Sequence, residues 1–422
     1  MRFSVLRLLA TLLLGVATTV TLAEAPPETI EDLWAIIQAQ QAEIEELKRQ
    51  QAATAQQAAQ ADEKAAVADE KAEAAVVAVE ETATSAGNWA DKTTLGGYGE
   101  LHYNNLDSKE EVDFHRFVLF LGHEFTDSIR FFAELELEHA VSGGDYDGEV
   151  ELEQAYIEFD LNEYHSLQTG VFLLPVGILN EIHEPTTFYG VERNPIETNI
   201  IPTTWWEAGA GFHGELGKGF SYNLTGSSGL DVRTTGSKAF VIRNGLQKVS
   251  KAKANDGAVT GRIKWTGMPG VELGVSAQWQ KDVTQGDLGV GATLLEAHAD
   301  IQRGPFGFRA LYARWDLEKS NRIDESDPAA IGRDEQVGWY IEPSYKTSIG
   351  KIPGEFGIFA RYNAWDNNAG SSRTDSEKKQ LSAGINYWPI PDVVFKLDVQ
   401  QQDNDGDQKN DNGFNAGIGF QF

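Results

Sequence analysis

The sequence contains no cysteine, which excludes disulfide frameworks, thiol catalysis and cysteine-ligated zinc or iron–sulfur sites. Basic residues are also scarce, because 35 Lys and Arg stand against 64 Asp and Glu, for a formal net charge of −29. A protein that binds nucleic acid through bulk charge needs a basic surface, since its affinity comes from the release of phosphate counterions. We therefore expect no nucleic-acid partner.

Long apolar runs are missing too. No segment has 18 consecutive apolar residues, which excludes a transmembrane helix. The hydrophobic fraction is only 41%, yet the chain carries 42 Gly, 21 Phe, 12 Tyr and 10 Trp. Glycine-rich turns and many aromatic residues are typical of β structure, and the small apolar fraction fits a barrel filled with water instead of side chains.

Residues 1–23 predict a secretory signal peptide. Arg2 and Arg7 form a positive start, an apolar stretch follows over residues 8–17, and small residues precede a cleavage site after Ala23. The apolar stretch is too short to span a bilayer. We expect the chain to be exported, the alternative being a buried N-terminal helix.

Residues 28–82 predict a coiled coil. Ile30, Leu33 and Ile37 begin a frame of alternating three- and four-residue spacings that continues, largely with alanine, over seven heptads. Coiled coils need partner chains, so this segment indicates a homo-oligomer. Ile and Leu in the frame favour two strands, whereas Gln40 and Gln51 leave the number open. A solitary solvated helix is the alternative.

Residues 93–422 alternate between apolar and polar side chains, as in residues 129–138, 271–279 and 414–422. Alternating segments of about ten residues are the signature of transmembrane β-strands. Counting short and long connections between them gives 16 antiparallel strands, with short turns in the periplasm and long loops outside. The first long loop is expected at 107–113, and the third, at 174–204, is the longest.

The fold class predicted is therefore an all-β membrane protein, a 16-stranded antiparallel transmembrane β-barrel preceded by an α-helical coiled coil. Tryptophans near strand ends, such as Trp205, Trp265 and Trp388, fit an interfacial girdle. The last strand ends in an alternating aromatic face that closes with Phe422. These features predict an outer-membrane location, with the coiled coil in the periplasm.

Three segments carry a closer resemblance. They are Gly97-Tyr-Gly-Glu-Leu-His-Tyr103, Asp113-Phe-His-Arg-Phe117, and Gly170-Val-Phe-Leu-Leu-Pro-Val-Gly177 leading into Val191-Glu-Arg-Asn-Pro195. Through them, residues 93–422 resemble bacterial outer-membrane porins and, more narrowly, the phosphate-selective porin O/P group. The resemblance implies 16 strands, a homotrimer, a third loop folded into the pore and an anion-selective lumen. The charge departs from that pattern, because this segment carries 28 basic and 49 acidic residues.

Alternation assigns the side chains that face the pore. It places His115 and His123 on the outer face, and Glu134, Glu136, Glu138 and other acids inside. Charged rings along a pore set its ion preference, although such charges can also simply pair across strands. The basic wall candidates are Arg116, Arg130, Arg262, Lys264, Arg314, Arg361 and Lys396, and the third loop adds Glu192 and Arg193 at the constriction.

One loop departs from the acidic balance, because residues 232–255 contain no Asp or Glu. A basic loop at a channel mouth can concentrate anionic solutes by steering. It can equally bind lipopolysaccharide phosphates or a neighbouring subunit. Its basic residues are Arg233, Lys238, Arg243, Lys248, Lys251 and Lys253.

Chemistry other than transport is not indicated. The sequence has no G-x-S-x-G, H-E-x-x-H or phosphate-loop motif, so we expect no enzyme activity, no cofactor and no metal site. The hypothesis is a porin that passes small hydrophilic solutes, with anions such as phosphate weakly favoured, in contact with membrane lipid and lipopolysaccharide. The alternative is an envelope tether whose coiled coil reaches peptidoglycan, with the barrel as its anchor.

Overall fold

The computed structural model describes residues 89–141, 148–286, 288–319, 327–370, 375–406 and 410–422, and eight positions between Trp34 and Arg49 whose backbone is helical. The chain divides into two compact units, Met1–Gly87 and Asn88–Phe422. The predicted signal peptide and nearly all of the predicted coiled coil lie outside the described residues. No helix among the described residues is long and apolar enough to cross a membrane.

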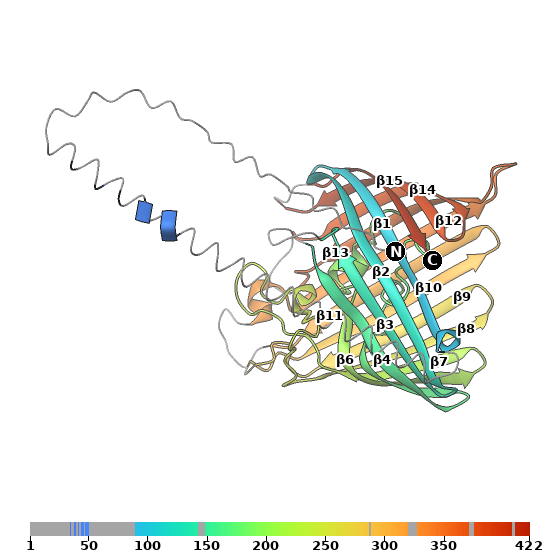
Figure 1. Ribbon diagram of the computed structural model, residues 1–422, viewed down its shortest axis with the longest axis horizontal. Helices are drawn as coiled ribbons and strands as arrows, with labels where there is room; N and C mark the ends of the chain where they lie inside the picture. The colour runs from blue at the N-terminus through green and yellow to red at the C-terminus, as the bar shows by residue number, and fades with distance from the viewer. Residues whose placement is uncertain are drawn as a thin grey trace, which may run out of the picture. The chain divides into compact units, whose positions relative to one another are not determined.

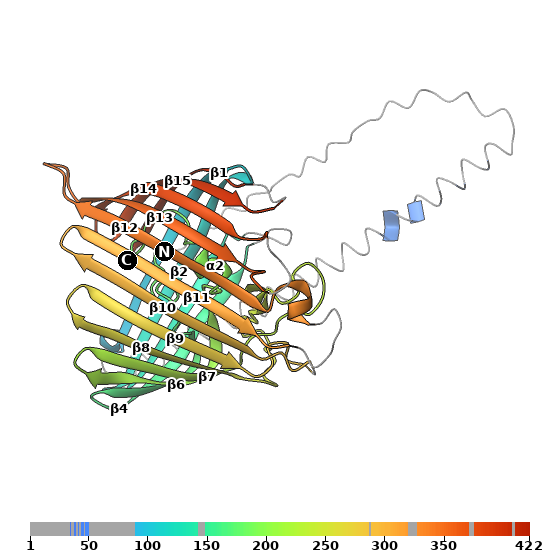
Figure 2. The ribbon, with the colours of Figure 1, turned by 180° about the vertical axis from the view of Figure 1, so that it is seen from behind.

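Sixteen antiparallel strands form one sheet, in which β1 pairs with β16 so that the sheet closes into a barrel (Figures 1 and 2). This confirms the predicted strand number and architecture of the barrel. The strands are β1 (Thr93–Leu106), β2 (Lys109–Thr126), β3 (Ile129–Glu138), β4 (Val150–Asn162), β5 (His165–Leu173), β6 (Trp206–Gly217), β7 (Phe220–Ser227), β8 (Ala258–Met268), β9 (Val271–Gln280), β10 (Ala292–Arg303), β11 (Phe306–Leu317), β12 (Glu335–Thr347), β13 (Glu355–Asp366), β14 (Lys378–Ile390), β15 (Val393–Asn404) and β16 (Gly413–Gln421).

Alternating side chains explain why these segments close into a barrel. In β9, Val275 and Trp279 are exposed on the outer face, whereas Ser276 and Gln278 are buried inside. An outer face of large apolar side chains is stable in contact with lipid, and a polar inner face is stable in contact with water. The period of two therefore selects both the strands and the side of the wall that each residue faces.

The connections at the two ends of the barrel differ in length, as predicted, with one exception. The long loop expected at 107–113 is a short turn, because β1 ends at Leu106 and β2 begins at Lys109. The charged residues after the turn continue the ladder, with Glu111 opposite Asn104. They suggested a loop because charged side chains are rare in lipid, but a hairpin that projects beyond the membrane can carry them.

Two long loops contain short helices and fold inward. The first, residues 174–205 between β5 and β6, is called L3 here and contains α2 (Ile196–Asn199). The second, residues 228–257 between β7 and β8, contains η2 (Ile242–Gly245). The remaining short helices are η1 (Ala90–Lys92) and η3 (Pro328–Ile331).

Apolar residues of these two loops build a core against the inner face of β10–β13. Trp205 of L3 lies 6.1 Å from Trp315 of β11, measured between ring centroids, and Phe240 of the second loop belongs to the same buried cluster. The Trp315 Nε1 donates to the Ile200 carbonyl at 3.0 Å. The barrel is therefore filled by a protein core on this side, which moves the water path toward the opposite wall.

Candidate channel constriction and vestibule

L3 crosses the lumen, and side chains of the barrel wall bind its backbone. A loop can be buried only if its carbonyl and amide groups find partners. Here the backbone carbonyls of five L3 residues, 183 and 186–189, accept hydrogen bonds from side chains of strands on different sides of the barrel. The donors are Arg116 to His183 O (3.0 Å), Trp388 to Thr186 O (3.2 Å), Arg309 to Thr187 O (3.1 Å), Asn386 to Phe188 O (3.2 Å) and Arg361 to Tyr189 O (3.1 Å).

Two side chains of L3 fix its own shape. The Asn180 amide donates to the carbonyls of Leu174 and Trp205, and its oxygen accepts from the Trp205 amide at 2.7 Å, so the two ends of the loop are tied together. The buried Glu197 carboxylate accepts from the backbone amides of Ile178 and Leu179 at 2.7 and 2.6 Å. Charge-assisted hydrogen bonds of this kind are the strong ones in proteins, so these contacts hold L3 in one shape inside the barrel.

A cavity of about 540 Å³, called the vestibule here, lies between L3 and the wall formed by β2–β4 and β13–β15. Its lining carries both signs of charge in similar number, together with the polar side chains Gln380, Gln400 and Gln402. The charged residues are Lys109, Arg116, Arg193, Arg243 and Lys248 against Glu136, Glu138, Glu151, Glu153, Glu192 and Asp411.

A second cavity, of about 350 Å³, lies below L3, near the short turns. It is lined by L3 residues 186–189 and by Arg309, Ser344 and Lys346 of the wall. The vestibule instead reaches Lys109 and Gln402, at the other end of the strands. L3 thus separates two polar cavities, which is the arrangement expected of a pore narrowed in its middle.

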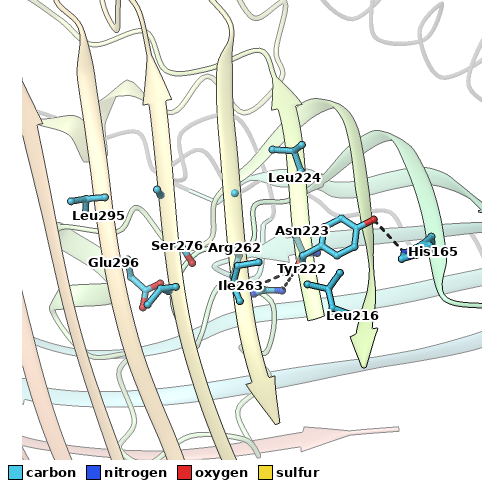
Figure 3. A pocket seen from close by; sticks show the side chains of 13 residues that line it. His165, Leu216, Tyr222, Asn223, Leu224, Arg262, Ile263, Ser276, Leu295 and Glu296 are labelled. Carbon is cyan, nitrogen blue, oxygen red and sulfur yellow. Dashed lines mark hydrogen bonds between the residues drawn. The ribbon is translucent and has the colours of Figure 1, made fainter. Parts of the chain in front are cut away.

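A third cavity, of about 790 Å³, is not on this path. It lies on the wall of β7–β10, where Leu224, Ile263 and Leu295 of the outer face contribute much of its lining (Figure 3). Figure 3 also shows Arg262 and Asn223, joined by a hydrogen bond, among its lining residues. Because its surface is mainly apolar and belongs to the lipid-facing side, it does not suit a hydrophilic solute.

The structure places six of the seven basic wall candidates toward the lumen, and five of these pair with carboxylates. The sixth, Lys396, has its Nζ 3.6 Å from the Phe188 ring centroid and has no hydrogen-bond partner among the described residues. Most lumen cations are therefore neutralised by the wall or by L3. The pairs are Arg116–Glu100 (2.6 Å), Arg130–Glu158 (2.7 Å), Arg262–Glu181, Lys264–Glu272 (3.2 Å) and Arg361–Glu342 (3.0 Å).

Arg314 is a correction, because it faces outward. Its neighbour Trp315 is fully buried against L3, while Arg314 is paired near the rim with Asp316 at 2.6 Å. β11 carries large apolar side chains on both faces, so apolar alternation alone misassigned its register. Arg309 lies five residues before Arg314 and therefore on the opposite face of β11. It faces inward and pairs with Asp300 at 2.9 Å.

His115 is a second correction, and its cause is a β-bulge. The register between β1 and β2 shifts between Glu100 and His102, so that Arg116 faces Glu100 but Asp113 faces His102. The extra residue turns His115 into the vestibule, where its ring stacks on His102 with centroids 4.8 Å apart. A bulge reverses the parity of a strand, and alternation cannot show where one occurs.

The two loop residues predicted at the constriction both line the vestibule. Burial raises the pKa of Glu192, but hydrogen bonds from His102 and Asn104 outweigh it and lower the pKa to about 2. Burial, with the nearby Arg116 charge, lowers the pKa of Arg193, whose Nη1 donates to the Thr204 hydroxyl at 2.8 Å. Glu192 therefore stays ionised at every physiological pH.

The basic loop divides into three parts. Arg243 and Lys248 line the vestibule, and Lys248 pairs with Glu149 at 2.6 Å and with Glu151. Lys253 pairs with Asp231 at 2.8 Å. The exposed remainder, which faces solvent, consists of Arg233, Lys238 and Lys251.

Comparison with known proteins identifies the group to which this barrel belongs. The family described as phosphate-selective porin O and P matches residues 84–422. An uncharacterized protein of Aquifex aeolicus (strain VF5) is 30% identical over 349 residues, covering 78% of this chain and 80% of the relative.

Solved structures with the same fold are outer-membrane proteins. An anion-selective porin from Comamonas acidovorans has a TM-score of 0.54 at 11% identity and covers 78% of this chain and 99% of its own. The outer membrane channel DcaP of Acinetobacter baumannii has a TM-score of 0.53 at 14% identity, with 78% and 97% covered. OmpT of Vibrio cholerae, in a trimer form, has a TM-score of 0.50 at 10% identity, with 78% and 99% covered. With the family match, these likenesses mean that this chain is an outer-membrane barrel belonging to the phosphate-selective porin O and P family.

Proposed function

We propose that the barrel is a passive diffusion channel for small hydrophilic solutes, with a weak preference for anions such as phosphate. The solute would enter the vestibule, pass L3 and leave through the cavity on the other side. The observation that carries the anion preference is a pair of vestibule cations, Arg193 and Arg243, that form no ion pair with any described carboxylate. A guanidinium without a carboxylate partner is free to bind the oxygens of an anion.

The preference is expected to be modest because most of the other lumen cations are engaged by carboxylates. Arg116, Arg262 and Arg361 already bind carboxylates, and an anion would have to displace them. The family name and the anion-selective porin of similar fold support the sign of the preference. The exposed lysines and arginine of residues 232–255 support it as well, since a basic mouth raises the local anion concentration.

We also propose a homotrimer, with the predicted coiled coil over residues 28–82 holding three chains in register in the periplasm. The trimer form of the similarly folded OmpT supports this assembly. The outer face of the barrel is apolar and fits contacts with lipid, lipopolysaccharide or a second copy. The family supports a channel and lends no support to the envelope tether.

The test is the reversal potential of the purified protein in a planar bilayer under a potassium chloride gradient, repeated with added phosphate. We expect an anionic sign, block by phosphate, and loss of the preference in Arg243→Gln and Arg193→Gln. Arg314→Gln is the matched control, because that arginine faces outward. A cationic sign in the wild type would refute the anion preference, and a protein without conductance would refute the channel.

A further inference from the structure

We propose that Glu134, Glu153 and His183 form a binding site for one divalent transition-metal ion, which fastens L3 to the barrel wall. The three side chains come from β3, β4 and L3, respectively, and the exposed fraction of each is at most 3%. The proposal does not depend on which solute the channel passes.

The distances fit coordination better than hydrogen bonding. The His183 Nε2 lies 3.6 Å from the Glu134 Oε1 and 3.6 Å from the Glu153 Oε2, and one ligand atom from each residue lies within 4.8 Å of the others. These separations are too long for good hydrogen bonds. Two ligands held at about 2.0–2.2 Å from a tetrahedral ion are roughly 3.3–3.6 Å apart.

The three facing atoms have no hydrogen-bond partner among the described protein atoms. Burying a carboxylate without a partner is costly, because it gives up its hydration. In two of these residues, Glu134 and His183, the second polar atom of the side chain is held by a hydrogen bond. Gln154 donates to the Glu134 Oε2 at 2.6 Å, and the His183 Nδ1 lies 3.2 Å from the Asn180 carbonyl oxygen. A histidine that donates from Nδ1 presents the Nε2 lone pair, as metal-ligating histidines do.

A second buried histidine of the lumen shows what a simple ion-paired imidazolium looks like. The His298 Nδ1 lies 2.7 Å from Glu296, and its Nε2 lies 3.4 Å from Glu272. Each nitrogen thus faces its own carboxylate, at hydrogen-bond distance for Nδ1 and at ion-pair distance for Nε2. At His183 both carboxylates face the same nitrogen, which carries at most one proton. A metal ion would compete with that proton for the Nε2 and would displace it on binding.

The backbone explains why these ligands meet. In the β3–β4 ladder, Glu134 lies opposite Gln154 and Leu135 lies opposite Leu152, so Glu153 is the extra residue of a β-bulge. The bulge turns Glu153 inward beside Gln154. Arg116 holds His183 in place, because the Arg116 Nη2 donates to the His183 carbonyl at 3.0 Å. Glu153 also lines the vestibule, which offers an ion a path to the site.

The donor set indicates the class of ion. Two carboxylates and one imidazole suit Zn²⁺ and the neighbouring divalent ions Mn²⁺, Fe²⁺ and Co²⁺. Ca²⁺ prefers six to eight oxygen ligands and fits this set poorly. No sequence spacing announces the site, because the ligands are far apart in the chain, and this is why no metal was expected from the sequence.

The test uses the purified, chelator-treated full chain carrying His139→Ala. This substitution breaks up a separate, half-buried group, Asp113, His115 and His139, which could also take up a metal. We expect calorimetric titration with Zn²⁺ to show one ion per chain, with the affinity weakened at least about tenfold by His183→Gln or Glu153→Gln. His298→Gln is the matched control and should bind as its parent does. Absence of binding in the parent, or equal binding after His183→Gln, would overturn the proposal.

A second measurement keeps the test independent of variant folding. X-ray absorption at the zinc edge, on the His139→Ala parent loaded with one equivalent, should show one imidazole among oxygen ligands. Two imidazoles, or none, would place the ion elsewhere and overturn the site. Heat-dependent mobility in gel electrophoresis checks that each variant retains the folded barrel.

Discussion

The two sides of the barrel interior are stabilised in different ways. On the β10–β13 side, tryptophans and aliphatic residues of L3 and of the β7–β8 loop pack into a core like that of a soluble protein. On the other side, β2–β4 contribute charged side chains and β14–β15 contribute amide side chains around the vestibule. The comparison teaches that apolar packing holds L3 on one side only, whereas hydrogen bonds from wall side chains hold its backbone on both sides.

The largest effect is expected on the apolar side. Trp315→Ala removes a fully buried ring and the donor to the Ile200 carbonyl, and should lower the free energy of unfolding by about 3–5 kcal/mol. Chemical denaturation of the reconstituted barrel measures this change. Trp339→Ala, on the exposed outer face, is the control and should cost much less. Equal losses would mean that the interior core adds little to the barrel.

A smaller effect is expected where ionic hydrogen bonds hold L3. The Asp398 carboxylate accepts from the Val191 amide at 2.7 Å and from Asn415 at 3.0 Å. Asp398→Asn replaces one of the two accepting oxygens by an NH₂ group, which then faces an N–H donor. We expect this to lower the free energy of unfolding by about 1–3 kcal/mol. Hydrogen exchange of the Val191 amide should accelerate, while exchange in the Trp205 segment should stay slow. Acceleration of both would show that the two sides of L3 move as one unit.

The pH dependence of the vestibule is a third way to separate the two sides. The pKa of Glu192 is lowered from 4.5 to about 2, so the stabilisation it gives is fully present above about pH 4.5 and is lost as the pH falls through about 2. Exchange of L3 amides next to Glu192 should therefore increase only in strong acid. Glu192→Gln should remove this acid dependence. An increase already near pH 5 would contradict the lowered pKa.

The smallest effect is expected at the rim of the vestibule. Lys248 pairs with Glu149 in an exposed position, and such pairs contribute about 0–1 kcal/mol. Lys248→Ala should leave the denaturation midpoint nearly unchanged, yet it should shift the reversal potential toward cations because it removes a vestibule charge. A large loss of stability together with an unchanged reversal potential would assign Lys248 to the fold instead of the pore.

The sequence predicts the barrel well because its period of two is set by lipid on one face and water on the other. It predicts individual wall residues less well, and the reasons are local. His115 and Glu153 turn inward at bulges, and a bulge has no strong sequence signal. Arg314 was misassigned because β11 has large apolar residues on both faces. The hydrogen bonds from wall side chains to L3 carbonyls cannot be predicted from the sequence, because every residue has a carbonyl group.

The binding of L3 through its carbonyl groups has a consequence for how such channels diversify. The wall residues Arg116, Arg309 and Arg361 hold backbone oxygens that are present whatever side chains the loop carries. Substitutions in the loop can therefore alter what the opening accepts while the loop keeps its place. Related barrels can therefore evolve different solute preferences through substitutions in L3 alone, while the wall residues that bind its backbone stay the same.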